Sequence, residues 1–391
     1  MPGVFLAMPL HYGTIKAIKQ GGISMIRVGI AGIGFIAEEY IKLFTQGQIQ
    51  GAEIRALSSR NYTHMAQIQE KYQLEAALFT DYDAMLTSGC IDMVMICTPH
   101  YYHPGMAIRA IEQGIHTMIE KPVGVYPEEL NALLECVKAH PQTQAGVLYC
   151  RRTNPVFAKI KELLTEGALG SLKRVTWIVT DMYRTQAYFD IAGWRGTYSG
   201  EGGGLLMNQV SHHIDLLVWL CGLPEAMQAH CYTARERNIE VENEVSITME
   251  YPGNATGQFI ASTREFPGSS RLEISGSRGQ IILEGEKDLT IRILETEETE
   301  FNATNKIPFA FIPYKEEVEH FDTMYNPVLQ AKIVNNFISS IREGAPVTCP
   351  VEEAILSQQF IIGAYLSSWQ EKKLTLPADA NSFTAELKKR Q

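Results

Sequence analysis

The sequence contains no apolar run that approaches the roughly 20 residues a membrane-spanning helix requires. It is also short of positive charge, because 34 Lys and Arg residues stand against 44 Asp and Glu residues, for a formal net charge of -10. A broad nucleic-acid footprint needs clustered Lys and Arg that displace counterions. We therefore expect neither a membrane nor a nucleic acid among the partners of this chain.

Cysteine is scarce and irregularly placed. There are seven cysteines, an odd number, and none forms a C-x-x-C pair. This disfavours both a disulfide framework and a structural zinc site, and a reducing cytoplasm fits the composition best. The cysteines are Cys90, Cys97, Cys136, Cys150, Cys221, Cys231 and Cys349.

The first 24 residues lack the marks of a secretory signal. A short apolar piece at 4–10 has no basic residue before it and no clear small-residue cleavage site after it. The regular pattern begins abruptly at Met25. We expect residues 1–24 to be an extension outside the fold, with Met25 as a candidate for the true start.

From Met25 to residue 149, short β-branched runs alternate with helical patterns. This alternation predicts a parallel sheet with helices on both faces. All strand C-termini then lie along one edge, where such sheets bind ligands. The expected strands are 26–31, 53–57, 92–97, 115–119 and 144–149, and the expected helices are 35–44, 62–72, 81–87, 104–114 and 128–139.

The pattern changes after residue 149. Helical patterns at 155–164 and 204–220 accompany long alternating strands joined by Gly- and Pro-containing turns. An acidic stretch at 295–300 is expected to be a solvated edge or loop, and helices at 327–342 and 352–371 are expected to close the chain. The chain is thus predicted to hold a doubly wound α/β domain over 25–149 and an α+β domain over 150–391. The second domain carries a large, mostly antiparallel sheet.

The turn after the first strand has the composition of a dinucleotide-binding turn. Gly32, Gly34 and Ala37 match G-x-G-x-x-G/A directly after a strand and at the start of a helix. The first glycine permits the tight turn, the second lets the backbone approach a pyrophosphate, and the small third residue packs helix on strand. We expect a Rossmann domain whose cofactor lies on this turn, with Phe35 and Ile36 included in the contact.

The end of the second strand indicates which dinucleotide binds. A carboxylate there would bond the ribose 2′-hydroxyl of NAD, whereas a nearby Arg suits the 2′-phosphate of NADP. This chain has Ser58, Ser59 and Arg60, and no carboxylate. The pattern favours NADP over NAD, with Ser59 and Arg60 near the ribose, although a solvated helix-start role for Arg60 is the alternative.

Several further segments resemble the Gfo/Idh/MocA oxidoreductases, which include glucose–fructose oxidoreductases and inositol dehydrogenases. They appear in the family order from Met25 to about Pro377. The segments are Cys97-Thr-Pro-His-Tyr-Tyr-His103, Glu120-Lys121-Pro122, the glycines at 202–204, and a His-x-x-Asp helix that ends Trp219-Leu-Cys-Gly222.

The resemblance implies a catalytic pair, Lys121 and His212. Lys121 would polarise a substrate oxygen from a strand end, oriented by Glu120, and His212 would exchange the hydroxyl proton as general acid/base. An unperturbed histidine pKa near 6.5 would suit that role. Asn208 stands where many members carry Asp, four residues before His212, which would place both on one helical face. It would bind substrate without ionising, and Asp215 is a candidate to orient the imidazole.

The resemblance also implies further contacts. Substrate would meet His100 and the group Arg152, Tyr183, Trp194 and Arg195. Cofactor would meet Thr98, Pro99, His103, Glu120 and Lys121. Ordinary packing or a surface salt bridge is the alternative for each residue of that group of four. The alternative for His100 is packing near the nicotinamide, and that for His103 is a place at the helix start. The spacing of the histidines indicates no metal site.

These patterns predict an NAD(P)-dependent oxidoreductase that transfers a hydride between the nicotinamide and a secondary alcohol or carbonyl. The substrate would be a sugar, inositol or related polyol. The resemblance further implies a homodimer or homotetramer formed through the C-terminal sheet. The alternatives are an NAD-dependent glycosidase of the same fold and a non-catalytic regulator that senses dinucleotide and sugar.

Overall fold

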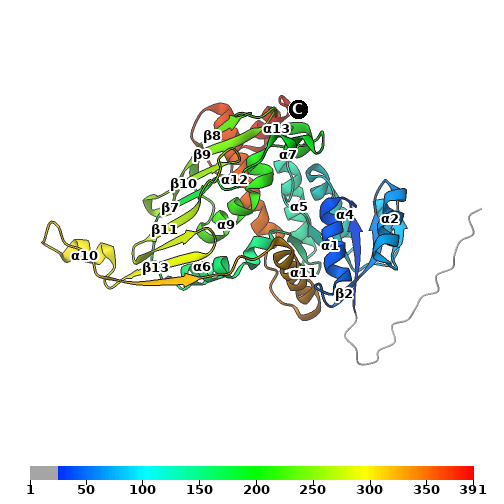
Figure 1. The fold of residues 1–391 in the computed structure, drawn as a ribbon, viewed down its shortest axis with the longest axis horizontal. Helices are drawn as coiled ribbons and strands as arrows, with labels where there is room; N and C mark the ends of the chain where they lie inside the picture. The colour runs from blue at the N-terminus through cyan, green and yellow to red at the C-terminus, as the bar shows by residue number, and fades with distance from the viewer. Residues whose placement is uncertain (1–24) are drawn as a thin grey trace, which may run out of the picture.

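The computed structural model describes residues 25–391, and the expected extension at 1–24 lies outside the described residues. Two sheets organise this part of the chain (Figure 1). The N-terminal sheet and its helices lie on one side and the larger sheet on the other, with α9 and α12 between them.

The N-terminal sheet is parallel and has six strands in the order β3-β2-β1-β4-β5-β6. Its strands are apolar and largely buried, as expected of a parallel sheet covered on both faces. The chain order reverses between β1 and β4, and a crevice at such a switch point is where these sheets bind ligands. The strands are β1 (Ile26–Ala31), β2 (Ala52–Ser58), β3 (Ala77–Phe79), β4 (Met93–Ile96), β5 (His116–Ile119) and β6 (Ala145–Val147).

The helices of this region begin where the sequence offers caps. The side chain of Asn61 accepts a hydrogen bond from the backbone of His64 at the start of α2, and Asp81 caps α3 in the same way. The helices are α1 (Phe35–Thr45), α2 (Tyr62–Tyr72), α3 (Tyr82–Thr87), α4 (His103–Glu112) and α5 (Pro127–Ala139). The predicted doubly wound α/β arrangement is confirmed, with β3 as an added short strand.

The larger sheet has nine strands in the order β14-β13-β12-β11-β7-β10-β9-β8-β15. Neighbours are antiparallel except for β7 and β10, so the prediction of a mostly antiparallel sheet is confirmed. The strands are β7 (Leu172–Val179), β8 (Ala226–Thr233), β9 (Glu242–Tyr251), β10 (Ala255–Ser262), β11 (Ser270–Gly276), β12 (Gly279–Glu284), β13 (Asp288–Leu294), β14 (Tyr314–His320) and β15 (Leu374–Thr375).

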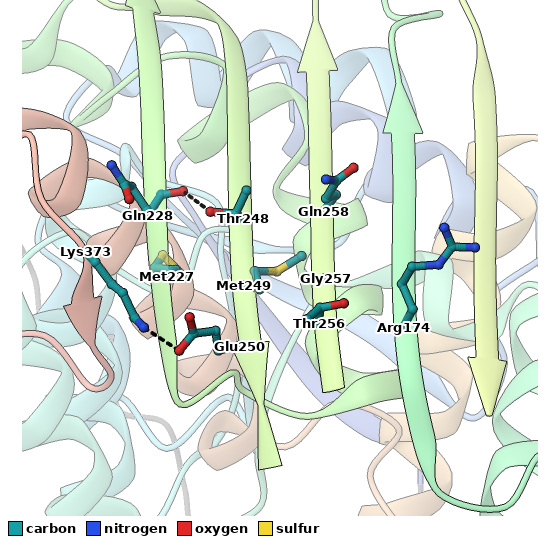
Figure 2. A pocket seen from close by; sticks show the side chains of 10 residues that line it. All are labelled: Arg174, Met227, Gln228, Thr248, Met249, Glu250, Thr256, Gly257, Gln258 and Lys373. Carbon is teal, nitrogen blue, oxygen red and sulfur yellow. Dashed lines mark hydrogen bonds and ion pairs between the residues drawn. The ribbon is translucent and has the colours of Figure 1, made fainter. Parts of the chain in front are cut away.

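The two faces of this sheet differ. Val245, Ile247 and Phe259 are buried on the face that the helices cover, whereas Ile260 points to the other face and is only half-buried. Figure 2 shows a hollow on the open face, where the polar side chains of Gln228 in β8, Thr248 in β9 and Gln258 in β10 stand on successive strands. The alternation of buried and exposed positions along each strand produces this asymmetry.

Helices of the second half return to the first. Helix α11 contacts α1, and α12 and α13 contact α5. The backbone of Val147 in β6 donates to the carbonyl of Cys349 at 2.9 Å. The helices are α6 (Pro155–Thr165), α7 (Gln186–Asp190), α8 (Tyr198–Glu201), α9 (Ser211–Cys221), α10 (Glu298–Thr304), α11 (Asn326–Glu343), α12 (Val351–Gln370) and α13 (Ala380–Lys388).

Three expectations for the second half need correction. The helix expected over 204–220 is interrupted: Leu205–Gln209 forms a π-helical turn, Val210 leaves helical geometry, and α9 starts at Ser211. The acidic stretch at 295–300 runs into α10, which lies in the connection between β13 and β14 and projects away from the sheet (Figure 1). A third helix, α13, follows the two that were expected to close the chain.

Candidate active site

The glycine turn between β1 and α1 is shaped to receive an anion. Gly32 has a φ of +86°, and a Cβ there would lie 2.8 Å from the backbone of Cys97 and Thr98. A Cβ at Gly34 would meet no atom within 4 Å, so the backbone beside it is open. No described side chain caps the start of α1, which leaves the first-turn N–H groups to a ligand. The residues present fit a dinucleotide diphosphate.

The remaining turn residues differ in exposure. Phe35 is 81% exposed, Ile36 is half-buried, and Ala37 is fully buried against the core as the third small residue of the turn. At the end of β2, Ser59 is half-buried and its hydroxyl accepts from the backbone of Asn61 at 3.3 Å. The side chain of Arg60 is exposed.

The ends of β4 and β5 are tied together by His103. Its ring is buried, with Nδ1 2.8 Å from the carbonyl oxygen of Pro122 and Nε2 2.7 Å from that of Thr98. The ring therefore joins the segment that follows β4 to the segment that follows β5. Its position favours a supporting role behind the cofactor site rather than direct contact.

Glu120 is buried beneath the same edge. One carboxylate oxygen accepts from the Tyr40 hydroxyl at 2.7 Å, and the other accepts from the backbone N–H of Lys121 at 3.0 Å. Burial raises the pKa of this carboxyl, and its bond from Tyr40 and the nearby Lys121 charge oppose that rise. Glu120 thus fixes the backbone that carries the lysine.

Lys121 meets Asn208 across the two halves of the chain. The Lys121 ammonium donates to the carbonyl oxygen and to the side-chain Oδ1 of Asn208, both at 2.9 Å. Burial lowers the pKa of Lys121, while Glu120 and Glu201 raise it in part. A partly desolvated ammonium at a strand end can polarise a carbonyl oxygen or donate a hydrogen bond to a hydroxyl oxygen.

His212 lies at the start of α9, edge-on to Tyr149 with ring centroids 5.6 Å apart. Within residues 25–391 its buried Nδ1 has no hydrogen-bond partner. Burial, followed by the charge of Lys121, holds the pKa of His212 well below its usual value. The imidazole is therefore neutral at pH 7, and the expectation of an unperturbed pKa does not hold. The break at Val210 also means that helical spacing does not relate His212 to Asn208.

His100 and Arg195 lie near Lys121. His100 Nδ1 lies 3.0 Å from the carbonyl oxygen of Glu201, and burial lowers the pKa of His100 to about 3. The Arg195 guanidinium covers the rings of Tyr188 and Trp194, at 4.8 and 4.5 Å from their centroids. Its charge contributes to the lowered pKa of Lys121, which places it near the lysine.

Tyr183 lies elsewhere. It is 40% exposed and pairs with Phe266 and with the guanidinium of Arg237. These contacts do not join it to Lys121 or Asn208, so the structure leaves Tyr183 outside the cluster.

Arg152, expected near the substrate, is engaged in a buried ion pair. Its guanidinium donates to both carboxylate oxygens of Asp215 at 2.8 Å and also meets Glu353. Ser357 donates to Asp215 as well, at 2.9 Å. Asp215 is thus paired with Arg152 and does not orient His212. Arg152 stabilises the fold and does not line the substrate pocket.

Two buried carboxylates were not anticipated. Glu201 accepts from the Asn208 side chain and from the backbone of Gly196. Glu242 accepts from the backbone N–H groups of Gly204 and Leu206 and from the Tyr365 hydroxyl. Both hold the turn that carries Asn208, and nothing in their sequence context indicates burial.

Two negative findings concern the described residues only. Across 25–391, no three or more His, Cys, Asp and Glu side chains are grouped so as to hold a metal ion. No helix in this range is long and apolar enough to cross a bilayer.

The fold and the open glycine turn define a dinucleotide-binding α/β protein. Family models identify it further. Residues 26–147 match the model described as an oxidoreductase family with an NAD-binding Rossmann fold, and residues 157–282 match the GFO/IDH/MocA C-terminal domain. The chain belongs to the Gfo/Idh/MocA family and is an NAD-binding oxidoreductase.

Individual relatives agree with this assignment. Scyllo-inositol 2-dehydrogenase (NADP(+)) IolW of Bacillus subtilis is 24% identical, over 90% of this chain and 97% of that protein. A levoglucosan dehydrogenase in complex with NADH shares the fold at a TM-score of 0.75 and 20% identity, over 91% of this chain and all of that one. The WlbA dehydrogenase of Bordetella pertussis, in complex with NADH and UDP-GlcNAcA, shares the fold at a TM-score of 0.73 and 23% identity. That match also covers 91% of this chain and all of the other.

Proposed function

We propose that this protein transfers a hydride between a nicotinamide cofactor and a secondary alcohol or carbonyl of a sugar, inositol or related polyol. The observation that carries the proposal is the ammonium of Lys121, held by Asn208 beside His212 at the ligand-binding edge of the parallel sheet. The glycine turn opens at the same edge.

A bound nicotinamide would accept or supply the hydride. In the oxidation direction Lys121 would donate a hydrogen bond to the substrate oxygen, which lowers the pKa of the hydroxyl. His212 is neutral and so is in the form that takes up the hydroxyl proton. In the reduction direction the ammonium of Lys121 would polarise the carbonyl.

Two features support a polyhydroxylated substrate. Arg195 and Trp194 offer a guanidinium and an aromatic face near the lysine, and His100 adds an uncharged imidazole. Several relatives carry names that specify sugars or polyols, among them D-glucoside 3-dehydrogenase of Escherichia coli. Ser59 and the exposed Arg60 support NADP as the preferred cofactor.

The direct experiment is a panel of polyols and sugars, supplied with NAD and NADP separately and followed by nicotinamide absorbance. We expect sustained reduction of the cofactor with at least one substrate. Loss of a glycosidic bond without net cofactor reduction would replace the proposal with the glycosidase alternative. Binding without any turnover would favour a regulator.

We also propose that the open face of the larger sheet pairs two copies of the chain, as the family resemblance implies. Arg174, Gln228 and Thr248 border the hollow on that face, and Lys373 pairs with Glu250 across it (Figure 2). Light scattering tests this: the mass of a dimer or tetramer is expected, and a monomer would exclude it. We also propose a cytoplasmic location, which the odd number and irregular spacing of the cysteines favour.

A further inference from the structure

The side chain of Asn208 lies between a cation and a carboxylate. Its Oδ1 accepts from the Lys121 ammonium at 2.9 Å, and its Nδ2 donates to Oε1 of Glu201. An ammonium only donates and an ionised carboxylate only accepts, so the two neighbours fix the orientation of the amide. A continuous hydrogen-bonded chain therefore runs from Lys121 to Glu201.

Glu201 is held for this contact. It ends α8 directly before the glycines at 202–204, and only 1% of the residue is exposed. Its second oxygen accepts from the backbone of Gly196 at 2.7 Å. Burial raises the pKa of Glu201, whereas its hydrogen bonds and the charges of Arg195 and Lys121 lower it. These partners oppose the effect of burial and so favour the ionised form of the carboxylate.

Glu120, the other nearby carboxylate, does not belong to this hydrogen-bonded chain. Both oxygens of Glu120 are occupied, one by the Tyr40 hydroxyl and one by the backbone N–H of Lys121. Glu120 adds negative charge near the ammonium but forms no hydrogen bond to it. The only described carboxylate in the hydrogen-bonded chain of the ammonium is that of Glu201.

We propose that Glu201 is a positioning residue that acts through the Asn208 amide to hold the Lys121 ammonium in place and charged. The inference rests on the proposed function. It explains how a chain with Asn at position 208 keeps a carboxylate hydrogen-bonded, through one amide, to the lysine ammonium. The carboxylate is displaced by one amide group along the hydrogen-bonded chain.

A reciprocal swap tests the proposal without changing the number of heavy atoms. In E201Q two amide groups face each other, and either orientation of Asn208 then places a donor against a donor. In N208D two carboxylates face each other. In E201Q/N208D, the carboxylate now at position 208 accepts from Lys121 and from the amide now at position 201, and the oxygen of that amide still accepts from Gly196. Every hydrogen bond is restored.

We expect each single variant to lower kcat/KM by at least about tenfold, and the double variant to recover most of that loss. The proposal would be overturned if the kcat/KM of the double variant were no higher than that of the less active single variant. If E201Q fails to fold, folding becomes the readout, because the swap should rescue the fold as well. A double variant that also fails to fold contradicts the pairing.

Glu242 provides the matched control. It is another buried carboxylate of the same turn, but it accepts from Gly204, Leu206 and Tyr365 and not from the Asn208 side chain. Adding N208D to E242Q should therefore give no rescue. Rescue in both backgrounds would show a general effect of charge and would overturn the specific pairing.

A second readout does not depend on turnover. Competitive labelling with fluorodinitrobenzene, followed by mass spectrometry, gives the pKa of the Lys121 amine in each variant. The titratable groups around it are Glu120, Cys150, Arg195, Glu201 and the imidazoles of His100, His103 and His212. We expect E201Q to lower the pKa of Lys121 by about one unit and the double variant to restore it.

The two proposals fail separately. If the wild-type protein turns over no substrate, the proposed function fails, while the labelling experiment still decides the role of Glu201. If wild-type turnover is found and the pKa of Lys121 does not respond to Glu201→Gln, only the positioning role fails.

Discussion

The two sheets contribute to the site in different ways. In the parallel sheet, the glycine turn, Ser59, Thr98 and Lys121 each follow a strand, so the strand ends themselves bring them together. In the larger sheet no strand end carries a proposed catalytic residue. Asn208 and His212 lie on a turn and a helix that pack on its buried face.

The site residues of the second region are held in place by buried charged side chains. The turn at Leu205–Gln209 is held by the buried carboxylates of Glu201 and Glu242, and α9 is anchored by the buried pair of Arg152 and Asp215. Buried charges cost free energy unless they are paired. We therefore expect loss of one partner of a buried ion pair in the second region to reduce stability, and substitutions at the strand ends to reduce only binding or catalysis.

The largest stability effect is expected for Arg152→Met. It leaves Asp215 buried without its cation, and loss of one partner of a buried ion pair costs about 3–5 kcal/mol. Thermal unfolding should show a clear loss of Tm with little change in KM. Arg152→Met/Asp215→Leu should recover part of the loss. Unchanged stability with a raised KM would indicate instead that Arg152 contacts the substrate.

A smaller and pH-dependent effect is expected for Glu242→Gln. Burial raises the pKa of Glu242 to about 7 in the folded protein, against about 4.5 when unfolded. Because the folded state binds this proton more tightly, its contribution to stability is complete below pH 4.5 and is lost as the pH rises through 7. The loss amounts to about 3 kcal/mol.

Urea unfolding of the wild type and the variant between pH 4.5 and 8 measures this contribution. As the pH rises, the free energy of unfolding should fall in the wild type and not in Glu242→Gln, so the difference between them should shift in favour of the variant. Parallel curves would show that Glu242 does not titrate in this range and that its carboxylate is not a source of pH dependence.

The smallest effect is expected at a strand end. Arg60→Ala should weaken NADP binding by about tenfold and leave NAD binding and Tm nearly unchanged, since an exposed guanidinium contributes to phosphate recognition and little to the fold. Fluorescence titration with each cofactor measures the ratio. Equal weakening of both cofactors, or of neither, would contradict the preference for NADP.

The same contrast explains what the sequence could predict. Strands such as β4 are buried on both faces and appear as continuous apolar runs, and Asn61 marks the start of α2. The sequence therefore predicts the N-terminal elements other than β3 to within a few residues. The glycine turn and Lys121 follow from the same local pattern.

The second region depends on contacts between distant residues. Tyr365 and Glu242 hold the π-helical turn from 161 and 36 residues away, and no local pattern reports that. Strand β14 is almost wholly exposed and charged, and so lacks the alternation that identifies a strand. For Arg152, a motif position indicated a pocket residue, but the partner that decides its role, Asp215, is 63 residues away.

The central claim is that Lys121 acts on the substrate and is not needed to hold the cofactor, and Lys121→Ala tests it most directly. For a substrate found in the panel, kcat should fall by about a thousandfold or more. The Kd of the reduced cofactor, measured by fluorescence, should change by less than about threefold, since the glycine turn is intact. Turnover that survives the substitution, or a cofactor affinity that falls in step with kcat, would contradict the account.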